Sequence, residues 1–340
     1  MKLNNEEILD ILQLYGIDSF NDVNMIDSSH GDDDIRHNYI LDKKYVLRVN
    51  NAKVMTETRI KELNTLIKRY NDFGIQAPYY LSYGNEQYVY EYKDCYCYVS
   101  EYLDCVIADD VKEVCREQLQ KERVIMVARF AQAYKNVDLI ETLSMYSLFD
   151  LCPYDQLSGL GIDEKQDNFN NLIKDVEEVQ EYELVKELHA FNDSTRNELL
   201  SYYKELPRCV FQGDENYSNV CVDDAYHICG LFDFNMSGTE VIANYLANIA
   251  LQGNYFYEDE IMQSKSAKEI FDMVISSFTK NTDLIKQYYA FEDREYEAYL
   301  LYAKIAMVCG YWNQYAFSEY IKKEEYKDKI VELLKLLVHY

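Results

Sequence analysis

The stretch from Cys209 to Ala247 constrains this chain more than any other part of its sequence. A short apolar run leads into Asp214, and Asn219 follows five residues later. Two further apolar runs, separated by a polar turn, predict a β-hairpin, and the second run leads directly into Asp233. A carboxylate and an amide therefore flank one tight loop, and a second carboxylate ends the hairpin after it.

This arrangement of side chains suits phosphoryl transfer to a hydroxyl group. One carboxylate, Asp214, would orient the attacking hydroxyl and accept its proton. The oxygens of Asn219 and Asp233 are the hard ligands that Mg²⁺ prefers, and Mg²⁺ needs few of them from the protein. The alternative is a pair of acidic turns on the surface, where Asp and Asn are common for reasons of backbone geometry alone.

The pattern resembles the catalytic core of the aminoglycoside phosphotransferase and choline kinase family, which are small-molecule kinases with a protein-kinase-like fold. That family has His-Gly-Asp, four residues, Asn, and then a hairpin that ends in Ile-Asp-Phe or a similar triplet. The resemblance implies that Asp214 is the catalytic base and that Asn219 and Asp233 bind the metal. The sequence departs from the family pattern at Gln212, which replaces the usual His, and at Asn244, which stands where the family has a structural Asp.

The resemblance implies an α+β fold with two lobes. Residues 1–103 would form a small nucleotide-binding lobe, with an antiparallel β-sheet and one helix. Residues 104–340 would form a larger, mainly helical lobe for catalysis and substrate binding. The hydrophobic periodicity agrees, because it is helical through most of the second region, for example over Phe169–Leu188 and Leu284–Trp312.

A cation on a predicted strand is the next candidate site residue. In Lys44–Val49 the side chains alternate, so Arg48 lies on the face opposite Leu47. The resemblance implies that Arg48 reaches the nucleotide phosphates, and a solvent-facing arginine is the alternative. The helix predicted after this strand supplies Glu62 as the carboxylate that would pair with Arg48, and Glu57 competes for that role.

The resemblance assigns nucleotide binding to two further segments. The first is a polar turn that would lie over the phosphates; it contains Ser28, Ser29 and Gly31, although it lacks a glycine-rich motif. The second is the interlobe hinge, whose backbone would bind adenine. Its residues are Ser100, Glu101, Tyr102 and Leu103.

Composition narrows the choice of partners. The formal net charge is −26 over 340 residues, which argues against nucleic acid and against anionic membrane surfaces, because both are bound by clustered Lys and Arg. The charge would attract a cationic substrate, although solubility is the better explanation of the charge. The nine cysteines lack metal or redox spacing, so we expect buried, reduced thiols in a cytoplasmic protein.

The sequence therefore predicts a kinase that uses Mg²⁺ and ATP, or GTP, to phosphorylate a hydroxyl of a small acceptor. An aminoglycoside or an amino alcohol would fit the negative charge, and a sugar or another metabolite is equally compatible with the sequence. A catalytically impaired module that binds a nucleotide or another ligand on the same fold is the alternative. An acidic helical interaction protein is a third hypothesis, and it requires the 209–247 pattern to be accidental. The oligomeric state is not predicted.

Overall fold

The computed structural model describes residues 2–29, 31, 34–53, 55–149, 163–252 and 256–340. In this part of the chain the residues group into two compact units. The first unit consists of residues 1–119 and 214–235, and the second of residues 120–213 and 236–340. The predicted boundary between residues 103 and 104 stays a prediction. The short segment 214–235 belongs to the first unit and carries Asp214, Asn219 and Asp233.

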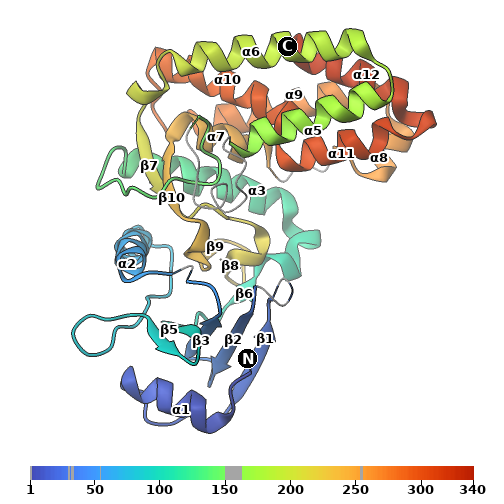
Figure 1. Cartoon of the computed structure of the whole chain (residues 1–340). Coiled ribbons are helices and arrows are strands. Elements are labelled where there is room, and N and C mark those ends of the chain that lie inside the picture. Colours follow the sequence, from blue (N-terminus) through green and yellow to red (C-terminus); the bar gives the residue numbers. More distant parts are fainter. Residues whose placement is uncertain (1, 30, 32–33, 54, 150–162, 253–255) are drawn as a thin grey trace. The chain divides into compact units, whose positions relative to one another are not determined.

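An antiparallel five-stranded sheet forms the centre of the first unit, with the strand order β1-β2-β3-β5-β4 (Figure 1). This sheet and the helices that dominate the second unit confirm the predicted α+β class. The strands are β1 (Val23–Asp27), β2 (Arg36–Leu41), β3 (Tyr45–Asn50), β4 (Tyr90–Tyr92) and β5 (Cys95–Glu101).

One face of this sheet is covered by the first helix, α1 (Asn5–Leu14). The helix begins with a capping box, in which the Asn4 side chain accepts from the Glu7 amide and Glu7 accepts from the Asn4 amide. Its apolar stripe packs into one buried cluster with the inward side chains of β2, β3 and β5. Leu47 and Cys97 are fully buried there, which leaves Arg48 on the opposite face, as predicted.

The second helix of this unit, α2 (Glu57–Asp72), begins after Thr56, whose hydroxyl accepts a hydrogen bond from the Arg59 amide. Its amide side chains hold the irregular chain that follows. Asn64 exchanges two hydrogen bonds of 2.9 Å with the backbone of Tyr80. Asn71 does the same with Ala77, at 2.9 and 3.1 Å.

A second sheet in the first unit carries the candidate site. It has the order β6-β8-β9 and joins β6 (Val106–Ile107), β8 (Val220–Val222) and β9 (Ile228–Leu231). The 3₁₀ turn η2 (Tyr217–Asn219) precedes β8, and η3 (Phe234–Met236) follows β9. The predicted hairpin is therefore present, with Val220 opposite Leu231.

The expectation of reduced cysteines is wrong for one pair. Cys105 and Cys221 form a disulfide, with their Cα atoms 5.7 Å apart, because the pairing of β6 with β8 brings the two residues together. The other described cysteines are free, and of these Cys229 is only partly buried. Cys152 lies outside the described residues.

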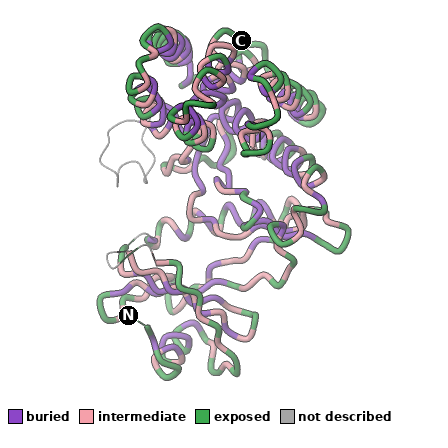
Figure 2. Tube along the Cα trace, turned by 90° about the vertical axis from the view of Figure 1, so that its right-hand side faces the viewer, coloured by how far each residue is buried: buried purple, intermediate pink, exposed green. Residues whose placement is uncertain are grey.

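The second unit is mainly helical, with one short antiparallel pair, β7 (Arg208–Phe211) with β10 (Gly238–Val241). The long helix α3 (Ala108–Ala133) begins in the first unit and ends in the second. The other helical elements are α5 (Glu164–Glu178), α6 (Tyr182–Leu200), the 3₁₀ turn η1 (Tyr203–Glu205), α7 (Ile242–Leu251), α8 (Asp259–Ser264), α9 (Ala267–Ile285), α10 (Asp293–Cys309), α11 (Tyr311–Ile321) and α12 (Glu324–Val338). Figure 2 shows buried and exposed residues alternating around these helical turns.

Two stretches predicted as single helices are interrupted. The Phe169–Leu188 stretch breaks between α5 and α6, where Gln180 adopts a left-handed φ of 64°. The Leu284–Trp312 stretch contains the end of α9, all of α10 and the start of α11, with Gly310 at the last break. Hydrophobic periodicity continues across each break because the helix before the break and the helix after it both bury an apolar face.

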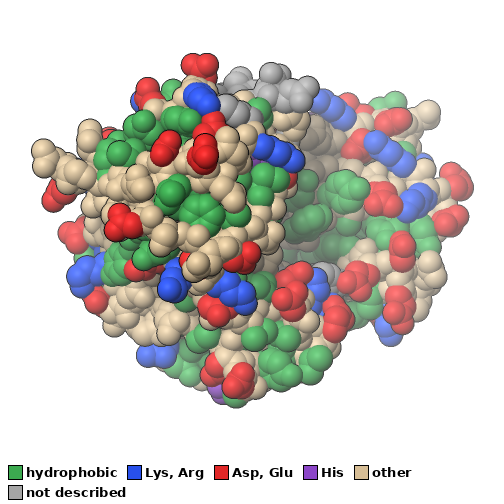
Figure 3. Space-filling model, turned by 90° about the horizontal axis from the view of Figure 1, so that it is seen from below, with side chains coloured by type: hydrophobic (Ala, Val, Ile, Leu, Met, Phe, Trp, Pro, Cys, Tyr) green, Lys and Arg blue, Asp and Glu red, His purple; other side chains and the backbone are tan. Residues whose placement is uncertain are grey.

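The surface agrees with the composition. Figure 3 shows acidic side chains interspersed with Lys and Arg on the face that it presents. None of the helices in the described ranges is long and apolar enough to cross a membrane.

Two glycines with left-handed backbone test local packing. Gly213 has φ +88°, and a Cβ atom added there would overlap the Met236 carbonyl, whereas Gly16 has φ +76° with open space around it. We expect Gly213→Ala to lower the free energy of unfolding by about 3 kcal/mol, from backbone strain plus overlap. Gly16→Ala, the matched control, should cost about 1 kcal/mol from strain alone. Urea denaturation measures both, and equal losses would contradict the packing.

Candidate active site

The β8–β9 hairpin brings the two predicted metal ligands together. Its last backbone hydrogen bond runs from the Phe232 amide to the Asn219 carbonyl at 3.1 Å. Asn219 therefore lies opposite Phe232, the residue just before Asp233. This contact places Asn219 and Asp233 at the same end of the hairpin, although thirteen residues of sequence lie between them.

The Asp214 carboxylate is held by amide groups of its own loop. The Asn219 side-chain nitrogen donates to Asp214 Oδ2 at 2.9 Å and to the Asp214 carbonyl at 3.0 Å. Asn216 donates to Oδ1. Both carboxylate oxygens are thus oriented before any substrate arrives, as a residue that must position a hydroxyl requires. Because the nitrogen of Asn219 faces Asp214, its oxygen is the end of the amide that a cation would take.

Burial raises the pKa of Asp214 to about 6, and the negative charge of Asp233 acts in the same direction. The hydrogen bonds from Asn219 and Asn216 oppose this rise without cancelling it. Two observations follow. Asp214 titrates near neutral pH, where a general base works best, and the two carboxylates lie close enough to repel each other.

Asp233 has an unusual backbone conformation, with φ +56°. The left-handed region is sparsely used by residues other than glycine, although Asp tolerates it better than most. The next residue, Phe234, is 1% exposed, and its ring meets that of Tyr70 on α2 edge-on, with the ring centroids 5.6 Å apart.

Arg48 lies within the same unit and is coupled to Asp233. Its Nη1 donates to Ser100 Oγ at 2.7 Å, and its guanidinium lies 5.9 Å from the centre of the Tyr80 ring. Burial disfavours the charge, but Tyr80, Tyr98 and Asp233 outweigh burial and raise the pKa of Arg48. A buried cation near the carboxylate that the sequence predicts as a metal ligand suits contact with a phosphate.

The two helix carboxylates weighed as partners of Arg48 have other contacts. Glu62 lies 3.6 Å from Arg59 Nη1. Glu57 accepts from the backbone amides of Tyr88 and Val89 at 2.8 and 2.9 Å. The structure therefore gives Arg48 a hydroxyl partner on β5 and Glu62 an arginine of its own helix, in place of the predicted Arg48–Glu62 pair.

The predicted phosphate turn is engaged in its own hairpin. Ser28 Oγ accepts from the Asn38 side chain, and Ser29 Oγ accepts from the Arg36 amide, both at 3.0 Å. Gly31 is exposed, with φ +92°. The neighbouring residues 30, 32 and 33 lie outside the described residues, so the role of this turn stays a prediction.

The predicted hinge uses part of its backbone internally. The Glu101 amide donates to the Tyr79 carbonyl at 2.9 Å, and the Tyr102 amide donates to the Lys44 carbonyl at 2.7 Å. Ser100 is buried and faces Arg48. Adenine recognition by these residues stays a prediction. The amides of Glu101 and Tyr102 already donate to backbone carbonyls, so they are not available as donors to adenine in this structure.

The two departures from the family pattern are buried in the second unit, with structural contacts. Gln212 is fully buried, and its carbonyl accepts from Ser237 Oγ at 2.9 Å. Asn244 is 1% exposed and donates to the Tyr146 carbonyl at 2.6 Å. The Asn244 side chain therefore supports the surrounding backbone, whereas the Gln212 bond is made by its main chain and does not depend on its side chain.

The donor set fits Mg²⁺ better than a transition metal. In the ranges that the structure describes, no group of three or more His, Cys, Asp or Glu side chains could hold a metal. One amide oxygen from Asn219 and one carboxylate from Asp233 are hard ligands, and Mg²⁺ completes its shell with water and phosphate oxygens. The repulsion between Asp214 and Asp233 is also what a divalent cation would relieve.

Sequence reasoning missed three residues near this site: Arg59, Tyr80 and Tyr98. Both tyrosines act to raise the pKa of Arg48, and the Arg48 guanidinium lies 5.9 Å from the centre of the Tyr80 ring. Arg59 precedes Glu62 by three residues, which is the spacing of neighbours on a helix surface. That spacing could have identified Arg59 as a partner of Glu62, whereas the tyrosines are brought in only by the folding of the sheet.

These residues define a candidate phosphoryl-transfer site of the kinase-like type, with a base, two oxygen ligands and a strand-borne cation in one unit. No family model matches the chain, and no curated protein matches its sequence.

Solved structures of similar fold include aminoglycoside phosphotransferase APH(4)-Ia with ADP and hygromycin B, at 14% identity over 97% of each chain with a TM-score of 0.46. Another is spectinomycin phosphotransferase APH(9)-Ia with ADP and spectinomycin, at 10% identity over 99% of this chain and 98% of that one, also with a TM-score of 0.46. APH(3″)-Id from Streptomyces rimosus has 13% identity over 88% of this chain and 98% of its own, again with 0.46. Identities and TM-scores this low leave activity and substrate to be argued from this chain's own residues.

The raised pKa of Asp214 predicts a pH-dependent cost to stability. The pKa of Asp214 in the folded chain, about 6, exceeds its ordinary value of 3.8. The folded state therefore binds the Asp214 proton more tightly than the unfolded state, and stability falls as the pH rises between these two values. Asp214→Asn removes this loss. We expect its melting temperature to exceed the wild-type value at about pH 7.5 by roughly 2–4 °C, allowing for partial solvent screening, and by less at about pH 5.

Asp223→Asn on the same hairpin is the control with the opposite sign. Hydrogen bonds from the His227 and Ala225 amides lower the pKa of Asp223, so this variant should be destabilised at the higher pH. Calorimetry at both pH values checks the pair. An Asp214→Asn difference that does not change with pH would contradict the assignment.

Proposed function

We propose that this chain is a kinase that transfers the γ-phosphate of ATP or GTP to a hydroxyl of a small acceptor, with Mg²⁺ as cofactor. The observation that carries the proposal is the grouping of Asp214, Asn219 and Asp233 at the end of one hairpin. The coupling of Arg48 to Asp233 supports it. A cytoplasmic location, where nucleoside triphosphates are available, belongs to the same proposal.

Each side chain has a distinct role in the proposed reaction. Asp214, held by Asn219, orients the acceptor hydroxyl and takes its proton as the hydroxyl oxygen bonds to the γ-phosphorus. The bond from the γ-phosphorus to the bridging oxygen breaks in the same transfer, and the nucleoside diphosphate leaves. Asn219 and Asp233 would hold Mg²⁺, which when bound would neutralise charge on the phosphate oxygens. Arg48 contributes a fixed positive charge to the same oxygens. Catalysis then consists mainly of positioning and charge stabilisation.

An impaired binding module on the same fold is the second candidate function. The sequence motivated it by Gln212 and Asn244. Both are buried, the Asn244 side chain donates to the Tyr146 backbone, and neither replaces Asp214, Asn219 or Asp233. We therefore favour the enzyme. The third hypothesis, an acidic interaction protein, would leave the three-residue grouping and the raised pKa of Asp214 without a role.

The proposed acceptor is a small cationic alcohol, such as an aminoglycoside or an amino alcohol. The net charge of −26 supports a cation, since an excess of one sign attracts ligands of the other. A panel of hydroxylated molecules, neutral and amine-bearing, scored for acceptor-dependent consumption of ATP and of GTP, tests both the acceptor and the nucleotide.

The role of Asp214 predicts a specific kinetic defect. With any acceptor from that panel, Asp214→Asn should lower kcat by roughly 10²- to 10⁴-fold, because it cannot take the proton. Asp224→Asn removes an exposed carboxylate from the turn of the same hairpin and should keep the wild-type rate. Both variants should still bind the Mg²⁺-nucleotide, as measured by thermal shift. An Asp214→Asn enzyme with wild-type kcat would refute the proposed base.

A further inference from the structure

We propose that Arg59 is a positioning residue. It links helix α2 to the loop after Asp233 and so fixes the direction of the Asp233 carboxylate, a ligand of the proposed metal. The inference rests on the proposed function, because it concerns the same Mg²⁺ site. It assigns a role to a residue outside the matched motif, on an element that the motif does not include.

The loop needs such a fastening because of its backbone. Asp233 has φ +56°, a conformation that costs an L-residue free energy relative to the ordinary regions and persists only where surrounding contacts fix it. The direction of the Asp233 carboxylate follows from this backbone. Relaxation to an ordinary φ would change that direction.

The first contact that fixes the loop is apolar. The Phe234 and Tyr70 side chains are both 1% exposed, and their rings meet edge-on at an interplanar angle of 68°. This packing holds the residue after Asp233 against the C-terminal half of α2. It fixes the position of the Phe234 ring but makes no hydrogen bond to the loop backbone.

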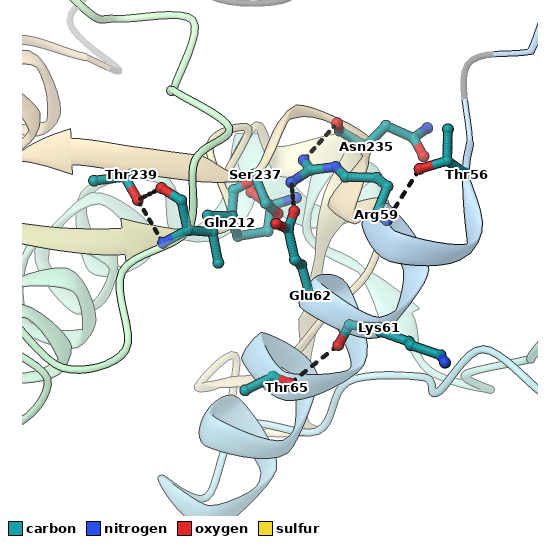
Figure 4. A network of polar contacts seen from close by, with 10 residues as sticks. Thr56, Arg59, Lys61, Glu62, Thr65, Gln212, Asn235, Ser237 and Thr239 are labelled. Atoms are coloured by element: carbon teal, nitrogen blue, oxygen red, sulfur yellow. Dashed lines mark hydrogen bonds and ion pairs between the residues drawn. The ribbon is translucent and has the colours of Figure 1, made fainter. Parts of the chain in front are cut away.

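The second contact is polar and involves Arg59. Its Nη2 donates to the Asn235 carbonyl at 3.2 Å, and its Nη1 lies 3.6 Å from Glu62 Oε2 (Figure 4). The Arg59 side chain is only 11% exposed, so the bond to the carbonyl is largely protected from water. Hydrogen bonds from a charged donor are stronger than neutral ones.

The shape of the guanidinium explains why an arginine suits this position. Its fork presents donors in fixed directions, so one group reaches Glu62 along the helix and the Asn235 carbonyl on the loop. The Arg59 backbone is itself fixed, because its amide donates to the Thr56 hydroxyl at the helix start. A lysine would keep the charge but offer a single ammonium for both partners.

The loop is thus held at two successive residues, Phe234 and Asn235, and both of them contact α2. Removing the Arg59 bond should loosen the residue that follows the Phe234 anchor and allow Asp233 to leave the left-handed region. Nucleotide contacts that do not pass through the metal would be unaffected. The expected defect is therefore in the Mg²⁺ dependence of binding, separate from nucleotide affinity.

The test uses the full chain and a fluorescent ATP analogue, titrated with Mg²⁺, so that no acceptor is needed. We expect Arg59→Gln to raise the Mg²⁺ concentration for half-maximal binding about tenfold, the effect of losing one charged hydrogen bond. Arg59→Lys should raise it about two- to threefold, because one donor remains. Binding of the analogue in EDTA should match the wild type in both variants.

Lys61→Gln is the matched control, since it removes one positive charge from the same helix at an exposed position that pairs with Glu86. It should titrate like the wild type. A melting curve of each ligand-free variant separates the two roles, because a merely structural role lowers the melting temperature without moving the Mg²⁺ midpoint. An Arg59→Gln variant with the wild-type midpoint overturns the inference. A wild-type chain whose binding ignores Mg²⁺ overturns the proposed function as well, so the two failures are distinguishable.

Discussion

The pairing of β8 with β9 is the constraint on which the candidate site depends. Two short strands joined by a tight turn return the chain to its starting point, so that Asn219, before the first strand, meets the residues just after the second. The hydrogen bonds between β8 and β9 fix the separation of Asn219 from the residues after β9, and they do so independently of any ligand. A carboxylate and an amide then share one end of the hairpin, and Asp214 is held there by Asn219.

This geometry conflicts with electrostatics, and the conflict has a chemical use. Two carboxylates are held near each other, partly out of water, so that the pKa of Asp214 rises to about 6. Folding alone would favour an uncharged residue at this position. A cation bound by Asp233 would lower the repulsion between the two carboxylates, so cation binding would stabilise the site. Functional sites commonly keep such unfavourable charge arrangements where the rest of the fold can support them.

The sequence predicted the parts of the site that are local in the chain. Asp214, Asn219 and Asp233 follow from the spacing of a turn and a hairpin, and the position of Arg48 follows from strand alternation. The partners of Arg48 did not follow, because Ser100 is on a strand 52 residues away and Tyr80 lies in an irregular segment. The Cys105–Cys221 disulfide, whose cysteines are 116 positions apart in the sequence, was unpredictable for the same reason. Helix breaks near Gln180 and Gly310 were missed because periodicity records which face is buried and not where the axis turns.

Helix α2 shows how much structural information a hydrophobic stripe leaves out. The hydrophobic stripe predicted a helix after β3 and supplies its buried apolar face, but polar side chains of α2 make further contacts that the stripe does not indicate. Glu57 binds the backbone at Tyr88 and Val89, Asn64 binds Tyr80, and Arg59 binds the loop after Asp233. Each holds an irregular segment whose backbone lacks a regular ladder of its own. A helix that satisfies the backbone of several loops makes their conformations interdependent, and so α2 ties the segment 214–235 to a part of the chain that lies some 150 residues earlier.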